Sequence, residues 1–271
     1  MVDGHIHIWN KEINPEIFVG NLKKANVERG IVLSRPPASF EKTYEGISWK
    51  DRIDGLMRFT EKYDCLYPFY FLDPTEDDVY DQIDYAIERK ARGFKAICTH
   101  YYPQEDNNLR VWQYIADKGK PIIFHSGILY NDRPSAQYNH PGCFEALFYI
   151  KNLRFSLAHV GWPWVDEMIA VFGKWEFFYK KNGQTEIADM YIDLAPGTPR
   201  IYRRDTLEKL FSVGYSMMKK RVYWGTDDNI NYNIPKSEDI YQYDKNILKD
   251  FLAEEEQKDI MHNNVLSFIE G

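Results

Sequence analysis

The 271-residue sequence has little cysteine, no long apolar run and no excess of basic residues. Its three cysteines are widely spaced and form no CxxC pair, which argues against a disulfide framework and favours a reducing compartment. No apolar stretch approaches the roughly 18 residues that a membrane-spanning helix needs. The first residues lack the basic and apolar regions of a signal peptide, so we expect a cytoplasmic protein.

The charge balance is acidic and argues against nucleic acid as a partner. The chain has 41 Asp and Glu against 34 Lys and Arg, a formal net charge of −7. Hydrophobic residues make up 44%, enough to bury a large core in one domain. We therefore expect a small-molecule substrate, no membrane and no nucleic acid, and the sequence leaves a homodimer open.

Two histidines two residues apart open the chain. His5 and His7 lie in the alternating segment 2–9, and in a strand such residues point to the same face. Two neutral imidazoles on one face are half of a metal site, although an isolated pair is more often two ordinary surface histidines. Asp3 shares this face, so it either orients a ligand histidine or lies deeper in the fold.

Three further apolar segments end in a residue that can ligate a metal. Segments 121–125 and 155–159 end in His125 and His159, and segment 222–227 ends in Asp227. In a parallel α/β fold the carboxyl ends of the strands converge at one mouth. Five such residues at predicted strand ends therefore indicate a metal site.

Apolar strands alternate with helical segments along the whole chain. We expect strands at 2–8, 30–34, 66–72, 94–99, 121–125, 153–159, 190–194 and 222–225. We expect helices at 14–25, 48–62, 75–92, 109–118, 141–151, 163–172 and 205–215, and one or two more within 237–269. The longest irregular segments are 35–47, 126–140, 175–188 and 228–235.

Eight strand–helix units predict the fold class, an α/β (β/α)8 TIM barrel, as a single domain over residues 1–271. A doubly wound sheet is the main competitor. Its glycine-rich phosphate motif is absent after the first strand, where the two histidines stand instead.

The strand-end residues divide into metal ligands and a proton-transfer group. His5, His7, His125 and Asp227 offer three nitrogens and one carboxylate, a set that suits one divalent ion. Zinc is the first expectation, with manganese, iron or cobalt as alternatives. His159 is expected to move a proton, with a further ligand or a core histidine as alternatives, and Asp227 is a second proton acceptor.

Several other side chains are candidates for substrate binding. His100 ends the fourth strand, Arg133 lies in the loop after the fifth, and Arg200 follows the seventh. An arginine there could bind a substrate carboxylate in bidentate fashion. Trp9 and Trp162 follow ligand-bearing strand ends and could line a planar substrate. The alternative for each is a solvated or packing side chain.

These motifs resemble the amidohydrolase superfamily. The resemblance covers about residues 2–269 and is carried by His5-Ile6-His7, His125, His159-Val160-Gly161 and Gly225-Thr226-Asp227. Segments 92–96, 159–163 and 263–265 resemble the amidohydrolase-related branch, which includes the aminocarboxymuconate-semialdehyde decarboxylase type.

The resemblance implies a barrel with one metal, held by the HxH pair, the strand-five histidine and the strand-eight aspartate. The strand-six histidine is implied as acid/base or substrate contact. Binuclear relatives bridge their metals with a carboxylated lysine at the end of strand four. Here segment 97–100 has no lysine and Lys95 lies early in the strand, which favours one metal.

The sequence is compatible with two activities. Hydrolysis of a small amide, lactone or ester through a metal-activated water is favoured, because each part it needs is accounted for. Decarboxylation or hydration of an unsaturated or aromatic carboxylic acid is the alternative. A catalytically silent metal-binding barrel is a third interpretation, which the intact set of ligand residues disfavours.

Overall fold

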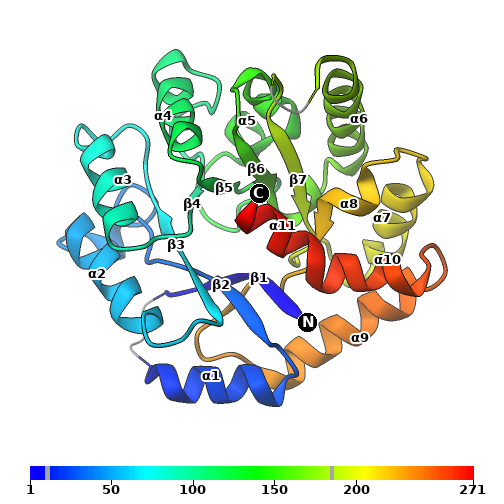
Figure 1. The fold of residues 1–271 in the computed structure, drawn as a ribbon, viewed down its shortest axis with the longest axis horizontal. Helices are drawn as coiled ribbons and strands as arrows, with labels where there is room; N and C mark the ends of the chain where they lie inside the picture. Colours follow the sequence, from blue (N-terminus) through cyan, green and yellow to red (C-terminus); the bar gives the residue numbers. More distant parts are fainter. Residues whose placement is uncertain (10–12, 184–185) are drawn as a thin grey trace.

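The computed structural model describes residues 1–9, 13–183 and 186–271. In this part of the chain, parallel strands form a curled, TIM-barrel-like sheet with helices around its outside (Figure 1). The strands are β1 (Val2–His7), β2 (Arg29–Leu33), β3 (Leu66–Phe71), β4 (Gly93–Ala96), β5 (Pro121–Phe124), β6 (Arg154–Leu157), β7 (Asp189–Asp193), β8 (Val222–Tyr223) and β9 (Asp228–Asn229). The helices are α1 (Pro15–Lys24), α2 (Trp49–Thr60), α3 (Val79–Glu88), α4 (Asp106–Asp117), α5 (Ser135–Asn139), α6 (Val165–Asn182), α7 (Arg200–Ser212), α8 (Met218–Arg221), α9 (Ile234–Leu248), α10 (Glu254–Lys258) and α11 (Asn264–Glu270).

The two ends of the sheet come from one stretch of chain. The strand order is β8-β7-β6-β5-β4-β3-β2-β1-β9, so β8 pairs with β7 while β9 pairs with β1. Only residues 224–227 separate β8 from β9. Within this gap the Gly4 N–H donates to the Trp224 carbonyl at 3.1 Å. The edge strands β8 and β9 are therefore close together, and the sheet curls into a form that is like a TIM barrel.

The strands are buried on both faces, which explains their continuous apolar runs. On β5, Ile122 and Phe124 pack outward in the core beneath the helices, and Ile123 lies in a separate cluster inside the sheet. Local signals start the helices as expected. The Asn14 side chain accepts the Glu16 N–H at 2.9 Å at the start of α1.

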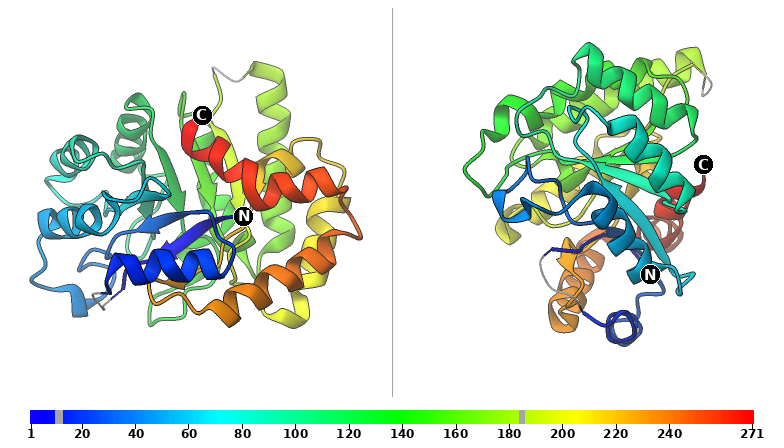
Figure 2. Two further views of the ribbon diagram at one scale, coloured as in Figure 1. Left: turned by 60° about the horizontal axis from the view of Figure 1, so that its bottom comes forward. Right: turned by 90° about the vertical axis from the view of Figure 1, so that its left-hand side faces the viewer.

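The last helix closes one end of the barrel-like sheet. Figures 1 and 2 show α11, in red, lying across the strands with the C-terminus near the middle of the view in Figure 1. Phe268 is fully buried, with ring centroids 5.1 Å from Tyr191 and 5.5 Å from Tyr223. Val2 at the amino end of β1 and Ile31 in the middle of β2 belong to the same cluster. The carboxyl ends of the strands are thus left for the functional site.

Several predicted elements differ from the structure. Predicted helix 141–151 is a 3-10 helix over Pro141–Tyr149, and predicted helix 75–92 is the shorter α3. Helix α6 continues to Asn182, because Trp175 and Tyr179 extend its buried face, so much of the predicted irregular segment 175–188 is helical. Residues 184 and 185 of that segment lie outside the described residues. Helix α7 begins at Arg200 rather than at residue 205, where the predicted helix starts. Three helices, α9, α10 and α11, replace the one or two predicted within 237–269; α9 begins earlier, at Ile234, and a π-helical turn at Asp259–Asn263 joins α10 to α11.

Two expectations from composition can be compared with the structure. All three cysteines are free thiols, in agreement with the absence of a disulfide pattern. Among the described helices, none combines the length and apolarity needed to cross a bilayer.

Candidate metal centre

The predicted ligand residues lie at the carboxyl ends of four strands. His5 and His7 come from β1, His125 follows β5, His159 follows β6, and Asp227 lies between β8 and β9. All four imidazoles are buried. The ring centroids of His5 and His7 are 4.9 Å apart, those of His5 and His159 5.2 Å, and those of His125 and His159 4.8 Å. The histidines therefore form one buried cluster.

The two histidines of β1 point to the inside because Ile6 between them packs outward into the main core. Their Nε2 atoms lie 3.1 Å apart. Oδ1 of Asp227 lies 3.2 Å from Nε2 of His7 and 3.6 Å from Nε2 of His5. His159 joins His5 and Asp227 in a group whose ligand atoms all lie within 4.8 Å of one another.

The spacing of these donors suits a small divalent ion. Two donors about 2.0–2.1 Å from a tetrahedral ion lie about 3.4 Å apart, close to the separations among His5, His7 and Asp227. Mixed nitrogen and carboxylate donors are the set that zinc and similar metals prefer. The residues present therefore fit the predicted metal.

Asp193, which sequence reasoning missed, holds the His5 ring in place. It ends β7, is fully buried, and its Oδ2 lies 2.5 Å from Nδ1 of His5. Its Oδ1 accepts the Ala195 N–H at 2.5 Å. A carboxylate on the far nitrogen fixes the tautomer of a ligand histidine and leaves Nε2 as the free donor. The sequence could have indicated Asp193, because the predicted strand 190–194 also has a carboxylate near its carboxyl end.

His125 and His159 differ in how their second nitrogens are used. Nε2 of His125 lies 3.2 Å from the Ile128 carbonyl, and Nδ1 of His159 lies 3.2 Å from the Ala195 carbonyl. His159, and not His125, has a nitrogen in the close group of ligand atoms. The assignment of His125 as a ligand and of His159 as the proton-transfer group stays a prediction.

Burial sets the protonation of the cluster. Desolvation lowers the pKa of all four imidazoles, which favours the neutral form that binds metals. Burial also raises the pKa of Asp193 to about 6. For Asp227 burial is the largest influence and raises the pKa, but the hydrogen bond with His7 and nearby histidine charges bring it below its ordinary value.

One buried amine faces the interior near this cluster. Phe94 and Ala96 of β4 pack outward, so Lys95 between them points into the barrel-like sheet. The prediction that Lys95 lies early in its strand is wrong, because β4 ends at Ala96. Its Nζ has no hydrogen-bond partner among the described residues, and burial lowers its pKa to about 8.

The backbone turns sharply where the strands deliver these side chains. His159 has φ 61°, Val160 has φ 54° and Asp227 has φ 50°. This left-handed region is rare for residues with a side chain, and most of all for β-branched valine. Each such residue costs about 1 kcal/mol or more. The surrounding structure holds three strained residues next to the donor atoms.

Asp3 supports the backbone of the site, and its hydrogen-bond partners among the described residues are backbone N–H groups and hydroxyls, with no imidazole ring. Its carboxylate accepts hydrogen bonds from the Thr226 hydroxyl at 2.6 Å, the Thr226 N–H at 2.9 Å and the Tyr232 hydroxyl at 2.9 Å. It also accepts the His5 N–H at 3.1 Å. Burial raises the pKa of Asp3 to about 7. Asp3 thus fixes the bend that carries Asp227.

Two of the predicted substrate-binding residues share a cavity at the mouth of the cluster. The Trp9 ring stacks on His7, with centroids 4.2 Å apart. Trp9 also lines a cavity of about 600 Å³ together with Arg133 and Lys42. The Arg133 guanidinium donates to the Ser39 carbonyl at 3.3 Å.

The other three candidates are engaged elsewhere. His100 is 3.1 Å from the Thr75 hydroxyl and partly exposed. Trp162 stacks on Tyr202 with centroids 6.3 Å apart. Arg200 is in the first turn of α7, where it forms an exposed ion pair with Asp239. None of these contacts involves a histidine of the cluster, and their roles toward a substrate stay predictions.

A TIM-barrel-like α/β fold with imidazoles and a carboxylate gathered at the carboxyl ends of its strands defines a class of enzymes built on such barrels. The sequence matches the amidohydrolase family over residues 58–266. The chain therefore belongs to the amidohydrolase family, which confirms the resemblance found in its motifs.

Solved structures share this fold at low sequence identity. An amidohydrolase from Burkholderia multivorans with bound zinc is 10% identical, with a TM-score of 0.72 over 99% of this chain and 98% of that one. A candidate amidohydrolase from Staphylococcus aureus is 13% identical, with a TM-score of 0.65 over 99% and 98%. A candidate 2-pyrone-4,6-dicarboxylic acid hydrolase from Pseudomonas putida is 13% identical, with a TM-score of 0.63 over 99% and 96%. No curated protein matches the chain.

Proposed function

We propose that this protein is a metal-dependent hydrolase of a small amide, lactone or ester. The observation that carries the proposal is the group of donor atoms on His5, His7 and Asp227, separated by 3.1–3.6 Å. His125 or His159 would complete the donor set. The zinc bound by the Burkholderia multivorans protein and the lactone-type substrate named for the Pseudomonas putida protein support this assignment.

The residues around these donors have separate roles in the proposed reaction. When bound, a divalent ion supplies Lewis acidity and lowers the pKa of a coordinated water toward neutrality. Asp193 orients His5, and Asp227 and the neutral His159 are placed to accept a proton. Trp9 and Arg133 line the cavity at the mouth, where a planar and anionic substrate would contact them.

The test combines metal content with turnover on one set of proteins. Purified protein should hold about one divalent ion per chain, and Asp227→Ala should lose it. His159→Asn should keep most of the metal, and its activity should be lower by about 10²–10⁴-fold. His262→Asn is the matched control, because His262 contacts Glu28 and Asn263, away from the cluster.

A substrate panel of lactones, amides and unsaturated carboxylic acids assigns the reaction. Hydrolytic products from the lactones or amides would support the proposal. Turnover of the acids alone, with release of carbon dioxide, would replace it with decarboxylation. Loss of metal together with activity in His159→Asn would make His159 a ligand.

A further inference from the structure

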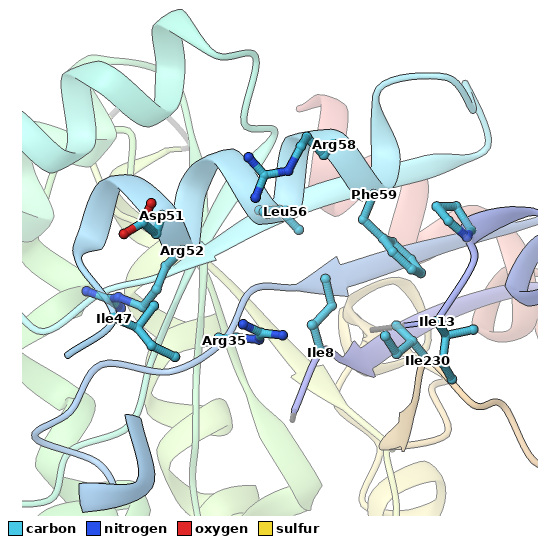
Figure 3. A pocket seen from close by; sticks show the side chains of 12 residues that line it. Ile8, Ile13, Arg35, Ile47, Asp51, Arg52, Leu56, Arg58, Phe59 and Ile230 are labelled. Carbon is cyan, nitrogen blue, oxygen red and sulfur yellow. The ribbon is translucent and has the colours of Figure 1, made fainter. Parts of the chain in front are cut away.

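A second cavity lies on the other side of β1 from the metal centre. It has a volume of about 300 Å³ and is bounded by α2, the segments after β1 and β2, and the start of α1 (Figure 3). Strand alternation separates the two sites. His7 faces the inside of the barrel-like sheet, and the next residue, Ile8, lines this outer cavity. The cavity is therefore not part of the proposed substrate site.

The lining combines an apolar surface with guanidinium groups. The apolar side chains come from several segments and are Ile8, Ile13, Ile47, Leu56, Phe59 and Ile230. Three arginines line the same space, against a single carboxylate from Asp51. Arg52 already has protein partners and is not free to bind a ligand. It is buried, donates to the Phe71 carbonyl at 2.8 Å and lies 3.6 Å from the Glu76 carboxylate.

The other two arginines keep unused donors. Arg35 donates from Nε to the Trp9 carbonyl at 3.2 Å, which leaves its two terminal nitrogens free of protein partners in the described part of the chain. Arg58, an exposed residue of α2, makes neither an ion pair nor a hydrogen bond with any described residue. Figure 3 shows Arg58 on α2 and Arg35 after β2 on opposite sides of the cavity. Guanidinium groups whose donors have no protein partner are suited to binding an anion that enters the cavity between them.

A glycine in the middle of α2 keeps the cavity open. Gly55 lines the cavity, and a Cβ placed there would meet only the Arg58 guanidinium, at 3.9 Å. Glycine destabilises a helix interior relative to alanine. Neither a left-handed φ nor a close contact requires glycine at this position. Its structural effect is to leave room beside Leu56 and Phe59.

We propose that this cavity binds a compact organic anion. The apolar body of the ligand would pack against the isoleucines and Phe59, and its acidic group would pair with Arg35 and Arg58. Pockets that bind small ligands combine an apolar lining with a few polar groups in the same way. This site is independent of the proposed hydrolysis, because β1 lies between the cavity and the metal ligands.

Calorimetric titration of the full chain with 2-naphthoate tests the proposal. The titrations use the Asp227→Asn background as well as the unaltered protein, so that a carboxylate bound at a metal is not counted. We expect a binding site for 2-naphthoate that is present in Asp227→Asn as well as in the unaltered protein. The neutral isostere 2-naphthamide and inorganic phosphate, which lacks an apolar body, should each bind at least about tenfold more weakly.

Three variants assign the binding to this cavity. Gly55→Leu should abolish it by filling the space, and Arg58→Gln should weaken it by about tenfold. Gly20→Leu is the matched control, because Gly20 is a helical glycine of α1 whose Cβ would meet nothing within 4 Å. Arg58 is exposed, so its variant should fold normally and keeps the test decisive if Gly55→Leu does not fold.

The proposal is overturned if 2-naphthoate shows no binding at millimolar concentration. Equal binding of 2-naphthamide, or unchanged binding in Arg58→Gln, would also overturn it. Binding that is lost in Asp227→Asn would assign the anion to the metal centre instead. Failure of the proposed hydrolase activity would leave these outcomes unaffected, because none of the titrations depends on turnover.

Discussion

The carboxylate of Asp193 meets the His5 ring at 2.5 Å, and this contact connects β7 with β1. Replacing Asp193 by asparagine keeps the shape and removes the negative charge. We expect Asp193→Asn to lower the affinity for the divalent ion by about 10–100-fold, because the ring loses the acceptor that orients it. Competition with a metal-sensitive chelating dye would measure this change.

Asp189→Asn is a suitable control for that experiment. Asp189 begins the same strand and pairs with Arg221 at 2.7 Å, at the opposite end from the histidines. Its substitution can affect stability but should leave metal affinity within about twofold. Equal affinities for Asp193→Asn and the unaltered protein would show that Asp193 does not orient the ligand.

Much of the site could be predicted at the residue scale, because its histidines end short apolar strands. The contacts among them could not. The bond between His5 and Asp193 joins residues far apart in the sequence, and no local pattern contains it. The contact between Nε2 of His125 and the Ile128 carbonyl likewise depends on the path of the loop after β5. Residue types were therefore predictable, and their hydrogen-bond partners were not.

Helix α6 is tied to the start of α8 by one buried carboxylate. Glu176 accepts hydrogen bonds from the Ser216 N–H and hydroxyl and from the Met217 N–H, each at 3.1 Å. Burial raises the pKa of Glu176, but these hydrogen bonds and that from Lys180 outweigh it, so the pKa lies below its ordinary value. The ionised form is thus favoured more in the folded than in the unfolded chain.

This depressed pKa makes the contribution of Glu176 depend on pH. It is fully present above the unfolded pKa of about 4.3 and is lost as the pH falls through the lower folded value. We expect Glu176→Gln to lower the free energy of unfolding by about 1–2 kcal/mol near neutral pH. The difference should shrink below about pH 4.3, as urea unfolding at several pH values would measure.

Glu167→Gln provides the comparison on the same helix, because Glu167 is exposed. It should change the free energy of unfolding by less than about 0.5 kcal/mol at any of these pH values. A loss in Glu176→Gln that stays constant from neutral to acid pH would mean that packing, and not the charge, makes the contribution.

The element order of the fold could be predicted because its signals are local. Apolar runs bounded by proline or glycine mark the strands, and Asn14 and Ser48 cap the helices as expected. The start of α7 was misplaced for a non-local reason. Arg203 is buried in a two-pronged ion pair with Asp244 of α9, at 2.9 and 2.7 Å. Arg203, a charged residue of the kind usually expected at the surface, is thus part of the interface between α7 and α9.

At the scale of the whole molecule, α11 contributes the side chain that fills one end of the barrel-like sheet. Phe268 touches rings from β3, β7 and β8 at once. We expect Phe268→Ala to lower the free energy of unfolding by about 3–5 kcal/mol, because the cavity cannot collapse between several strands. Denaturant unfolding followed by circular dichroism would measure the loss.

The neighbouring Ser267 is exposed, and Ser267→Ala should be nearly neutral in the same experiment. A loss below about 1 kcal/mol for Phe268→Ala would show that α11 rests on the sheet without filling it.

The left-handed residues after β6 and β8 have a consequence for anyone who engineers this protein. Glycine adopts that region at little cost, so His159→Gly and Asp227→Gly would relax the backbone at the positions that carry the proposed chemistry. A heat-survival screen would reward such changes and enrich for inactive clones. Selection for robustness in this protein must therefore be coupled to a readout of catalysis, because the two demands compete for the same residues.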